Sequence, residues 1–327
     1  MDIGLQNKCD LFIQNKEIVQ KAFKWENDRM NLLAGSMFAG AGRVADVDKL
    51  KECEQQLKHA AGIFSEFRGN LKMVLLVKMA LSDNPTEFFE GVEQVYKMIN
   101  KKHLFGSDMR LLAAVSIFEH SGVENAEQVI ARTNEIYNLM KKEHPFLTSE
   151  ENIPFAALLA LSGADTDKLL DEAERCYSAM KDKFFSSNAV QSLSHIMALD
   201  EQPTEVKTDK IAAIYNGLKQ NKKKFGTGSE LAALGVLAMS DQEVGFLVRE
   251  ISEVDDFLKN QKGFGIVGVG AAERLLYAAL LVADYYMPQS HIQGVVIESS
   301  LAAVIAEEML LLATLSVTTA SVAASSN

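Results

Sequence analysis

The sequence predicts an all-α protein in which helical hairpins of about 40 residues stack into a solenoid, or superhelix. Two aromatic columns support this prediction. The first recurs at separations of 41, 40, 38 and 42 residues and comprises Tyr96, Tyr137, Tyr177, Tyr215 and Phe257. The second recurs at separations of 41, 39, 40 and 39 residues and comprises Phe105, Phe146, Phe185, Phe225 and Phe264. No segment has the alternating pattern of a half-buried strand, so helices are favoured throughout.

The composition is that of a globular protein with a large core. The chain has 327 residues, of which 48% are hydrophobic and 24% are charged, and this excludes a disordered chain. Its formal net charge of −11 argues against a general nucleic-acid binder. Although the length alone suggests two domains, the repeat indicates one domain over residues 1–327.

The elements follow in order along this single domain. Residues 1–45 are expected to form N-terminal helices, with a glycine-rich stretch at 34–42 that is a loop or a close helix crossing. Hairpin repeats then occupy residues 46–287, and Phe67 marks a degenerate first unit. A terminal helix is expected over 288–315, followed by a disordered tail over 316–327.

Each hairpin combines two kinds of helix. The first is amphipathic, with apolar residues on one stripe, as in Phe88, Val92, Val95, Tyr96 and Ile99. The second is apolar on nearly all sides, as at 71–81, 111–118, 153–161 and 231–239. Such helices need cover on every side. The array is therefore tightly curved or closed into a toroid, or its inner layer lines a groove for an apolar or peptide ligand.

Helix boundaries have recognisable signals. Pro85 and Pro203 stand where the first turn of an amphipathic helix is expected. Four polar residues at one repeat position are expected to cap the same helices: Ser82, Ser162, Asp200 and Ser240. The terminal Ala/Leu-rich helix either folds back over the inner layer or pairs with a second copy of the chain, giving a homo-oligomer.

These features resemble a known bacterial family. Phe67-Arg68 ahead of the first clear apolar helix, the Tyr-then-Phe spacing and the alanine-rich final helix are similar to the all-helical domain-of-unknown-function family 4003. The resemblance covers nearly the whole chain and implies a bacterial origin. Its motifs are structural, so it implies no active-site residues.

No catalytic or cofactor motif stands out. The sequence 263–268 matches G-x-G-x-x-G but follows a predicted helix rather than a strand, so we interpret it as a hairpin connection. The six histidines show no i, i+4 metal spacing, and Cys176 lies on an apolar helix stripe. Adjacent carboxylates such as Asp255-Asp256 point about 100° apart on a helix and form no acid–base couple. We expect no catalytic residue, no cofactor and no metal.

The strongest functional signal is a column of cations where the amphipathic helices end. It comprises Lys101, Lys102, His103, Lys141, Lys142, His144, Lys181, Lys183, Lys222, Lys223, Lys224 and Lys262. One explanation is favourable interaction with the helix dipole, because cations are stabilising at helix C-termini. The other is a basic edge that recruits an anionic partner. Replacing Lys222, Lys223 and Lys224 by Glu is expected to leave the fold intact and weaken salt-sensitive binding.

The sequence therefore favours a non-enzymatic helical-repeat module that binds a protein or peptide. We expect it in the cytoplasm, because the first residues lack a signal-peptide pattern and three widely spaced cysteines suit a reducing compartment. No membrane span is expected, because charged residues interrupt the apolar segments 266–287 and 301–315. The alternative is a small-molecule binder or enzyme with a central site in a toroid. The candidate residues for that site are His195, Tyr277, Asp284 and Tyr285.

Overall fold

The computed structural model confirms an all-α protein. It describes residues 1–24, 26–60, 67, 69, 71–228, 230–264 and 269–287. Within these ranges there are fourteen α-helices, one short 3-10 helix and no strand. The expected helix at 288–315 and tail at 316–327 lie outside the described residues.

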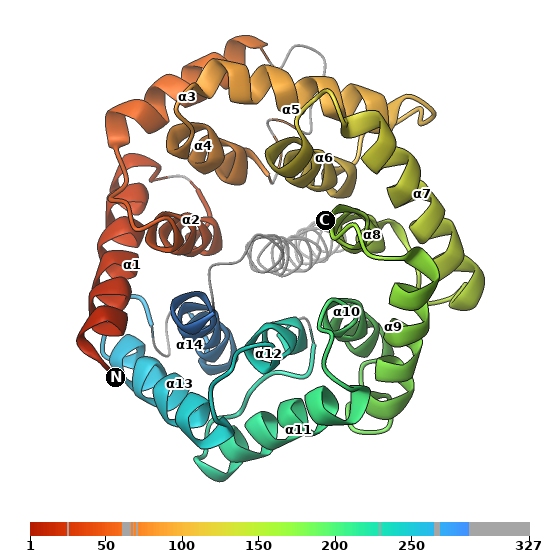
Figure 1. Ribbon diagram of the computed structural model, residues 1–327. Coiled ribbons are helices and arrows are strands. Elements are labelled where there is room, and N and C mark those ends of the chain that lie inside the picture. Colours follow the sequence, from red (N-terminus) through yellow and green to blue (C-terminus); the bar gives the residue numbers. More distant parts are fainter. Residues whose placement is uncertain are drawn as a thin grey trace, which may run out of the picture.

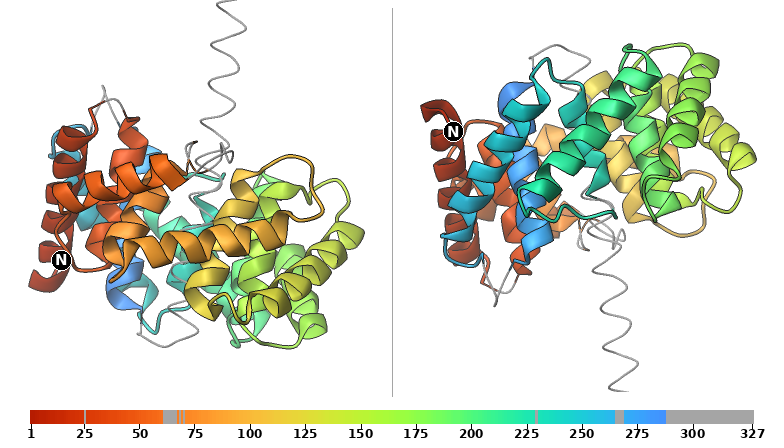
Figure 2. Two further views of the ribbon diagram at one scale, coloured as in Figure 1. Left: turned by 90° about the horizontal axis from the view of Figure 1, so that it is seen from above. Right: turned by 90° about the horizontal axis from the view of Figure 1, so that it is seen from below.

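The helices alternate between two concentric layers around a common centre (Figure 1). The outer layer contains α1 (Ile3–Ala22), α3 (Val47–Ala60), α5 (Pro85–Asn100), α7 (Ala126–Glu143), α9 (Thr166–Met180), α11 (Thr204–Gln220) and α13 (Val244–Lys259). The inner layer contains α2 (Asp28–Gly40), α4 (Lys72–Leu81), α6 (Asp108–Ser121), α8 (Ile153–Leu161), α10 (Ser187–Met197), α12 (Leu231–Ala238) and α14 (Ala271–Tyr286). Outer helices run along the perimeter, and inner helices are seen nearly end-on; Figure 2 shows the same layers edge-on.

The two layers differ because their sequences differ. In the inner helix α12 every residue is buried, as an all-apolar helix requires. The outer helix α9 buries only Leu169, Ala173, Cys176 and Met180, which lie on one stripe, and its other faces are polar. An amphipathic helix can cover the core with one face, whereas an all-apolar helix must lie between neighbours.

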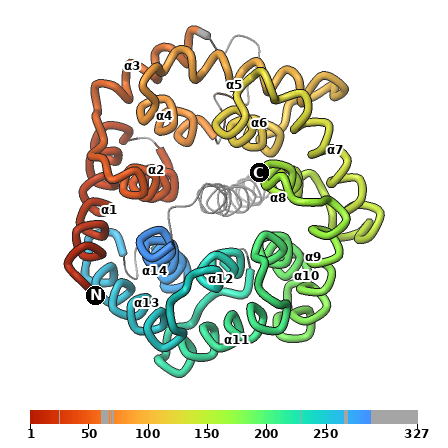
Figure 3. The backbone as a smooth tube through the Cα atoms, in the orientation of Figure 1, coloured from red at the N-terminus to blue at the C-terminus, as the bar shows by residue number. Residues whose placement is uncertain are grey.

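The first and last described helices meet, so the chain returns to its start (Figure 3). Phe12 of α1 stacks on Tyr277 of α14, with ring centroids 5.6 Å apart. Lys8 pairs with Asp284, and the N-terminal amine lies 3.5 Å from Glu250 of α13. We call this set of contacts the seam. It joins residues more than 200 positions apart in the sequence.

The glycine-rich stretch is a helix crossing rather than a loop. Residues through Gly40 are helical, and Gly35 faces the backbone of α1. A Cβ atom at Gly35 would lie 2.9 Å from the backbone nitrogen of Lys16, so no larger residue fits without displacing α1. This close approach explains the glycine.

The expected caps are misplaced by a few residues. Ser82 and Ser162 end the inner helices α4 and α8 instead of starting outer ones. Asn84 and Asp165 are the observed N-caps of α5 and α9, and each accepts a backbone N–H bond from the residue three positions later. Ser82 and Ser162 precede the true caps by two and three residues, and polarity alone does not distinguish the two ends of a short connection. Among the described helices, none is long and apolar enough to cross a bilayer.

Candidate functional site

The predicted cation column lies where the outer helices end. α5 ends at Asn100, α7 at Glu143, α9 at Met180, α11 at Gln220 and α13 at Lys259. The column residues all lie within two residues before or four after these ends. Most are exposed; His144 and Lys223 are half-buried. Their position agrees with dipole stabilisation, which therefore remains one explanation of the column.

Three of these cations link one outer helix to the next. His144 contacts Glu174 of α9 at 2.7 Å, Lys183 lies 4.0 Å from Asp209 of α11, and Lys223 lies 2.8 Å from Asp255 of α13. The two lysine ion pairs neutralise part of the column.

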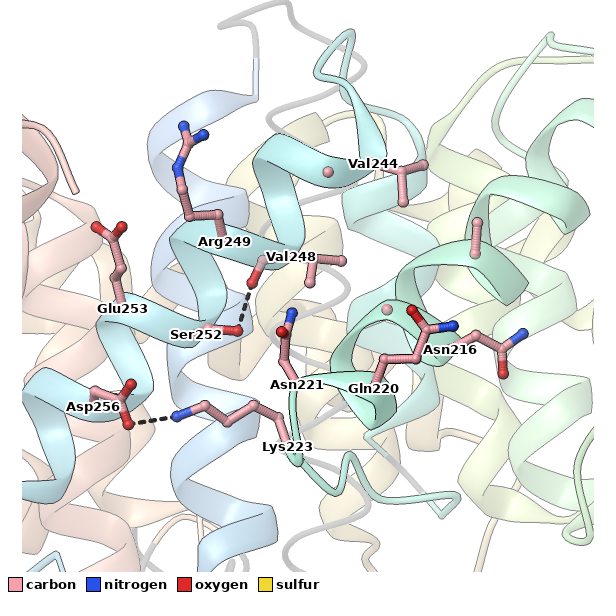
Figure 4. Close-up of a pocket in the computed structure, with 13 residues that line it drawn as sticks. Asn216, Gln220, Asn221, Lys223, Val244, Val248, Arg249, Ser252, Glu253 and Asp256 are labelled. Atoms are coloured by element: carbon pink, nitrogen blue, oxygen red, sulfur yellow. Dashed lines mark hydrogen bonds and ion pairs between the residues drawn. The ribbon is translucent and has the colours of Figure 1, made fainter.

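Lys223 has a structural role that the sequence did not reveal. Its ammonium also pairs with Asp256 (Figure 4), and the buried Asp255 is shared with Arg274 at 2.7 Å. A glutamate in place of Lys223 would face two carboxylates, one of them buried. We therefore expect the Lys223→Glu change to disturb the fold, contrary to the sequence-based expectation.

Between the same two helices lies an open groove of about 780 Å³ (Figure 4). Asn216, Gln220 and Asn221 line it on the α11 side, and Arg249 and Glu253 line it on the α13 side. The floor is made by small residues and valines: Ala213, Gly217, Val244, Gly245 and Val248. No polar atom of the groove is both buried and unpartnered among the described residues. Nothing in the described groove therefore indicates a specific ligand.

The second aromatic column divides into two groups. Phe225 and Phe264 are buried, at 5% and 4% exposure. Phe105, Phe146 and Phe185 are instead 81%, 99% and 100% exposed, and Leu104 is 96% exposed. The first three members of the column therefore do not pack in the core. Large apolar side chains that gather into one exposed patch mark an interaction site.

Hydrogen bonds link the surroundings of these phenylalanines. Arg110 at the start of α6 donates to the backbone oxygen of Phe105 at 2.8 Å and to Glu150 beside the next loop at 2.6 Å. Gln191 in α10 donates to Thr148 in that loop at 3.1 Å. These bonds join the loop of Phe105 to the loop of Phe146, and the second loop to α10, the helix that follows Phe185 in the chain.

We call the exposed lysines and large apolar residues at the ends of α5, α7 and α9 the basic phenylalanine rim. It consists of Lys101, Lys102, Leu104, Phe105, Lys141, Lys142, Phe146, Lys181, Lys183 and Phe185. The sequence pattern predicted the cations of the rim and did not predict that its aromatics are exposed. No local sequence signal separates the exposed phenylalanines from the buried ones, because Phe225 also follows lysines beyond a helix end and is buried.

The four candidate residues for a central site are not brought together. His195 of α10 lines a small pocket with α7 and α9. Tyr277 packs in the core against Phe12, whereas Asp284 pairs with Lys8. The Tyr285 hydroxyl lies beside Gly4 at the seam. His195 thus belongs to a different site from the other three.

The cysteines, the possible metal ligands and the glycine motif form no reactive site among the described residues. Burial raises the pKa of the Cys9 and Cys176 thiols to about 12, which keeps them protonated. No group of three potential metal ligands occurs among the described residues. Gly263 and Phe264 follow the end of α13, and positions 265–268 of the glycine motif lie outside the described residues.

Comparison with known proteins places the chain in a family. The model of a family described as protein of unknown function, DUF4003, matches residues 15–309. The Bacillus subtilis (strain 168) protein called "Uncharacterized protein YeaA" is 24% identical over 272 residues, which are 80% of each chain. No solved structure matches significantly. Because the family model covers most of its length, this chain belongs to the DUF4003 family.

Proposed function

We propose that this protein is a non-enzymatic, cytoplasmic interaction module whose helical hairpins form a closed α/α toroid. We further propose that its basic phenylalanine rim docks an acidic protein partner. The observation that carries the proposal is the near-complete exposure of Phe105, Phe146 and Phe185 within rows of lysines.

The composition of the rim suits such a partner. Protein interfaces are enriched in aromatic residues at their centre and have a polar border. Each buried phenylalanine removes about 150–250 Å² from water, and a standard interface covers about 800 Å² per partner. Three phenylalanines and Leu104 can therefore supply much of an apolar centre, while the exposed lysines favour acidic groups on the partner.

The rim can be tested by substituting its exposed aromatics. The variant Phe105→Ser, Phe146→Ser, Phe185→Ser should recover at least about tenfold less of a specific acidic partner from host extract than the wild type, because apolar contacts at an interface centre are lost. Its unfolding free energy should stay within about 0.5 kcal/mol per site of the wild type, since exposed side chains contribute little to folding. Quantitative mass spectrometry of the bound fraction and urea unfolding provide these two measurements.

A matched control uses exposed apolar residues elsewhere. The variant Ile3→Ser, Val44→Ser, Val206→Ser changes three side chains that are 82%, 52% and 49% exposed outside the rim, and it should bind like the wild type. Replacing Lys101, Lys102 and Lys181 by Glu should weaken binding most at low salt. Equal recovery by the phenylalanine variant would contradict the proposal. So would binding to phosphatidylglycerol vesicles that depends on the phenylalanines, because the rim would then recognise a lipid surface.

A further inference from the structure

A separate pocket of about 250 Å³ opens between α7 and α9 and reaches α10. Its wall includes His144 and Tyr177, whose rings lie 4.9 Å apart. Its deep end is formed by Gln191 and His195, which are 1% and 3% exposed. Each of these two buried side chains has one polar atom without a hydrogen-bond partner in the described structure: Gln191 Oε1 and His195 Nδ1.

The orientation of Gln191 follows from its neighbour. The Thr148 hydroxyl donates its single proton to the backbone oxygen of Met140 at 3.1 Å. Its oxygen can therefore only accept, and it accepts from Gln191 Nε2 at 3.1 Å. The amide must present Nε2 to Thr148, so Oε1 is left as a buried acceptor without a donor. Buried acceptors are nearly always hydrogen-bonded, so this oxygen is a position where a ligand N–H or O–H group can donate.

His195, four residues later in α10, adds a second buried polar atom without a partner in the described structure. Its ring lies 5.8 Å from the ring of Phe155, and burial lowers its pKa to about 3. The imidazole is therefore neutral at physiological pH and carries one acceptor nitrogen and one N–H. A neutral ring beside Gln191 presents no positive charge that would repel a cation.

The mouth of the pocket is acidic. Four carboxylates line it, from Glu143, Asp167, Asp171 and Glu174, against one ammonium group from Lys142. Glu174 also contacts His144 at 2.7 Å. The half-buried Tyr177 offers an aromatic face, which attracts cations. The pocket thus combines a buried acceptor at its floor with negative charge at its entrance.

We propose that this pocket binds a small organic cation bearing N–H donors, of the primary ammonium or guanidinium class. One N–H of the ligand donates to Gln191 Oε1, and the carboxylates at the mouth balance its charge. The volume restricts the ligand to a compact molecule. Lys142 belongs to both the rim and the pocket lining, but the inference does not rest on a protein partner.

Calorimetric titration tests the proposal with defined probes. Agmatine and butylammonium should bind saturably to the wild-type protein, whereas 1-pentanol and pentanoate, which are of similar size, should not. Gln191→Met removes the buried acceptor at nearly constant volume and should weaken agmatine binding about tenfold or more. Gln220→Met in the α11–α13 groove is the matched control and should bind like the wild type. Absence of saturable cation binding, equal affinity in Gln191→Met, or equal binding of pentanoate would each overturn the proposal.

A second measurement on the wild type does not depend on whether the variants fold. In protein with ¹⁵N-labelled histidine, the ring signals of His195 should shift saturably as agmatine is added. Those of His103, which is exposed and lies outside the pocket, should not shift. A titration that leaves the His195 signals unchanged, or that moves both rings equally, would overturn the assignment of the ligand to this pocket.

Discussion

At the residue scale, Asp255 and Asp256 are neighbours in sequence with opposite environments. Asp255 is buried and bonds Arg274 and Lys223, whereas the side chain of Asp256 is 65% exposed. We expect Asp255→Ala to lower the free energy of unfolding by about 3–5 kcal/mol, because it leaves the buried Arg274 guanidinium without its carboxylate. Asp256→Ala removes an exposed contact to the same lysine and should cost at most about 1 kcal/mol. Urea unfolding measures both, and equal losses would contradict the assigned roles.

At the element scale, Gly35 and Gly245 differ in what surrounds them. A Cβ at Gly35 would meet the backbone of α1, whereas at Gly245 in α13 nothing lies within 4 Å. Gly35→Ala should therefore destabilise the protein by about 1–3 kcal/mol, because two helices must separate. Gly245→Ala should stabilise it by up to about 1 kcal/mol through the higher helix propensity of alanine. Thermal and urea unfolding test the pair. If Gly35→Ala left the free energy of unfolding unchanged, α1 would be able to move away from α2 at little cost.

The elements themselves were largely predictable from sequence, because the pattern that identifies them is local. The apolar run at 153–161 coincides with α8, and the proline at 85 begins α5. The sequence left two alternatives for the glycine-rich stretch and did not predict the exposure of Phe105. Both features depend on which residues of a neighbouring element lie opposite. The pocket was missed for the same reason. No sequence pattern singles out Gln191, because its role depends on the contact with Thr148 that orients its amide.

At the scale of the whole molecule, the seam determines how the ends of the array behave. In an open array the terminal units contact one neighbour only and open first. Here Phe12 of α1 packs against both Tyr277 and Phe264, with ring centroids 5.6 and 6.1 Å apart. Lys16, which is buried, donates to the backbone oxygen of Lys262 at 2.6 Å. The first and the last described helix therefore both have neighbours on two sides.

We accordingly expect amide hydrogen exchange in α1 and α14 to be as slow as in α8, because opening either end must break the seam. Phe12→Ala removes the shared ring and should lower the free energy of unfolding by about 3–5 kcal/mol. It should also speed exchange in α1 and α14 together while leaving α8 the slowest of the three. Phe88 packs against Phe118 away from the seam, so Phe88→Ala is the control that should leave the two ends equally protected. Faster exchange of α1 than of α8 in the wild type would mean that α1 opens independently and that the seam does not stabilise it.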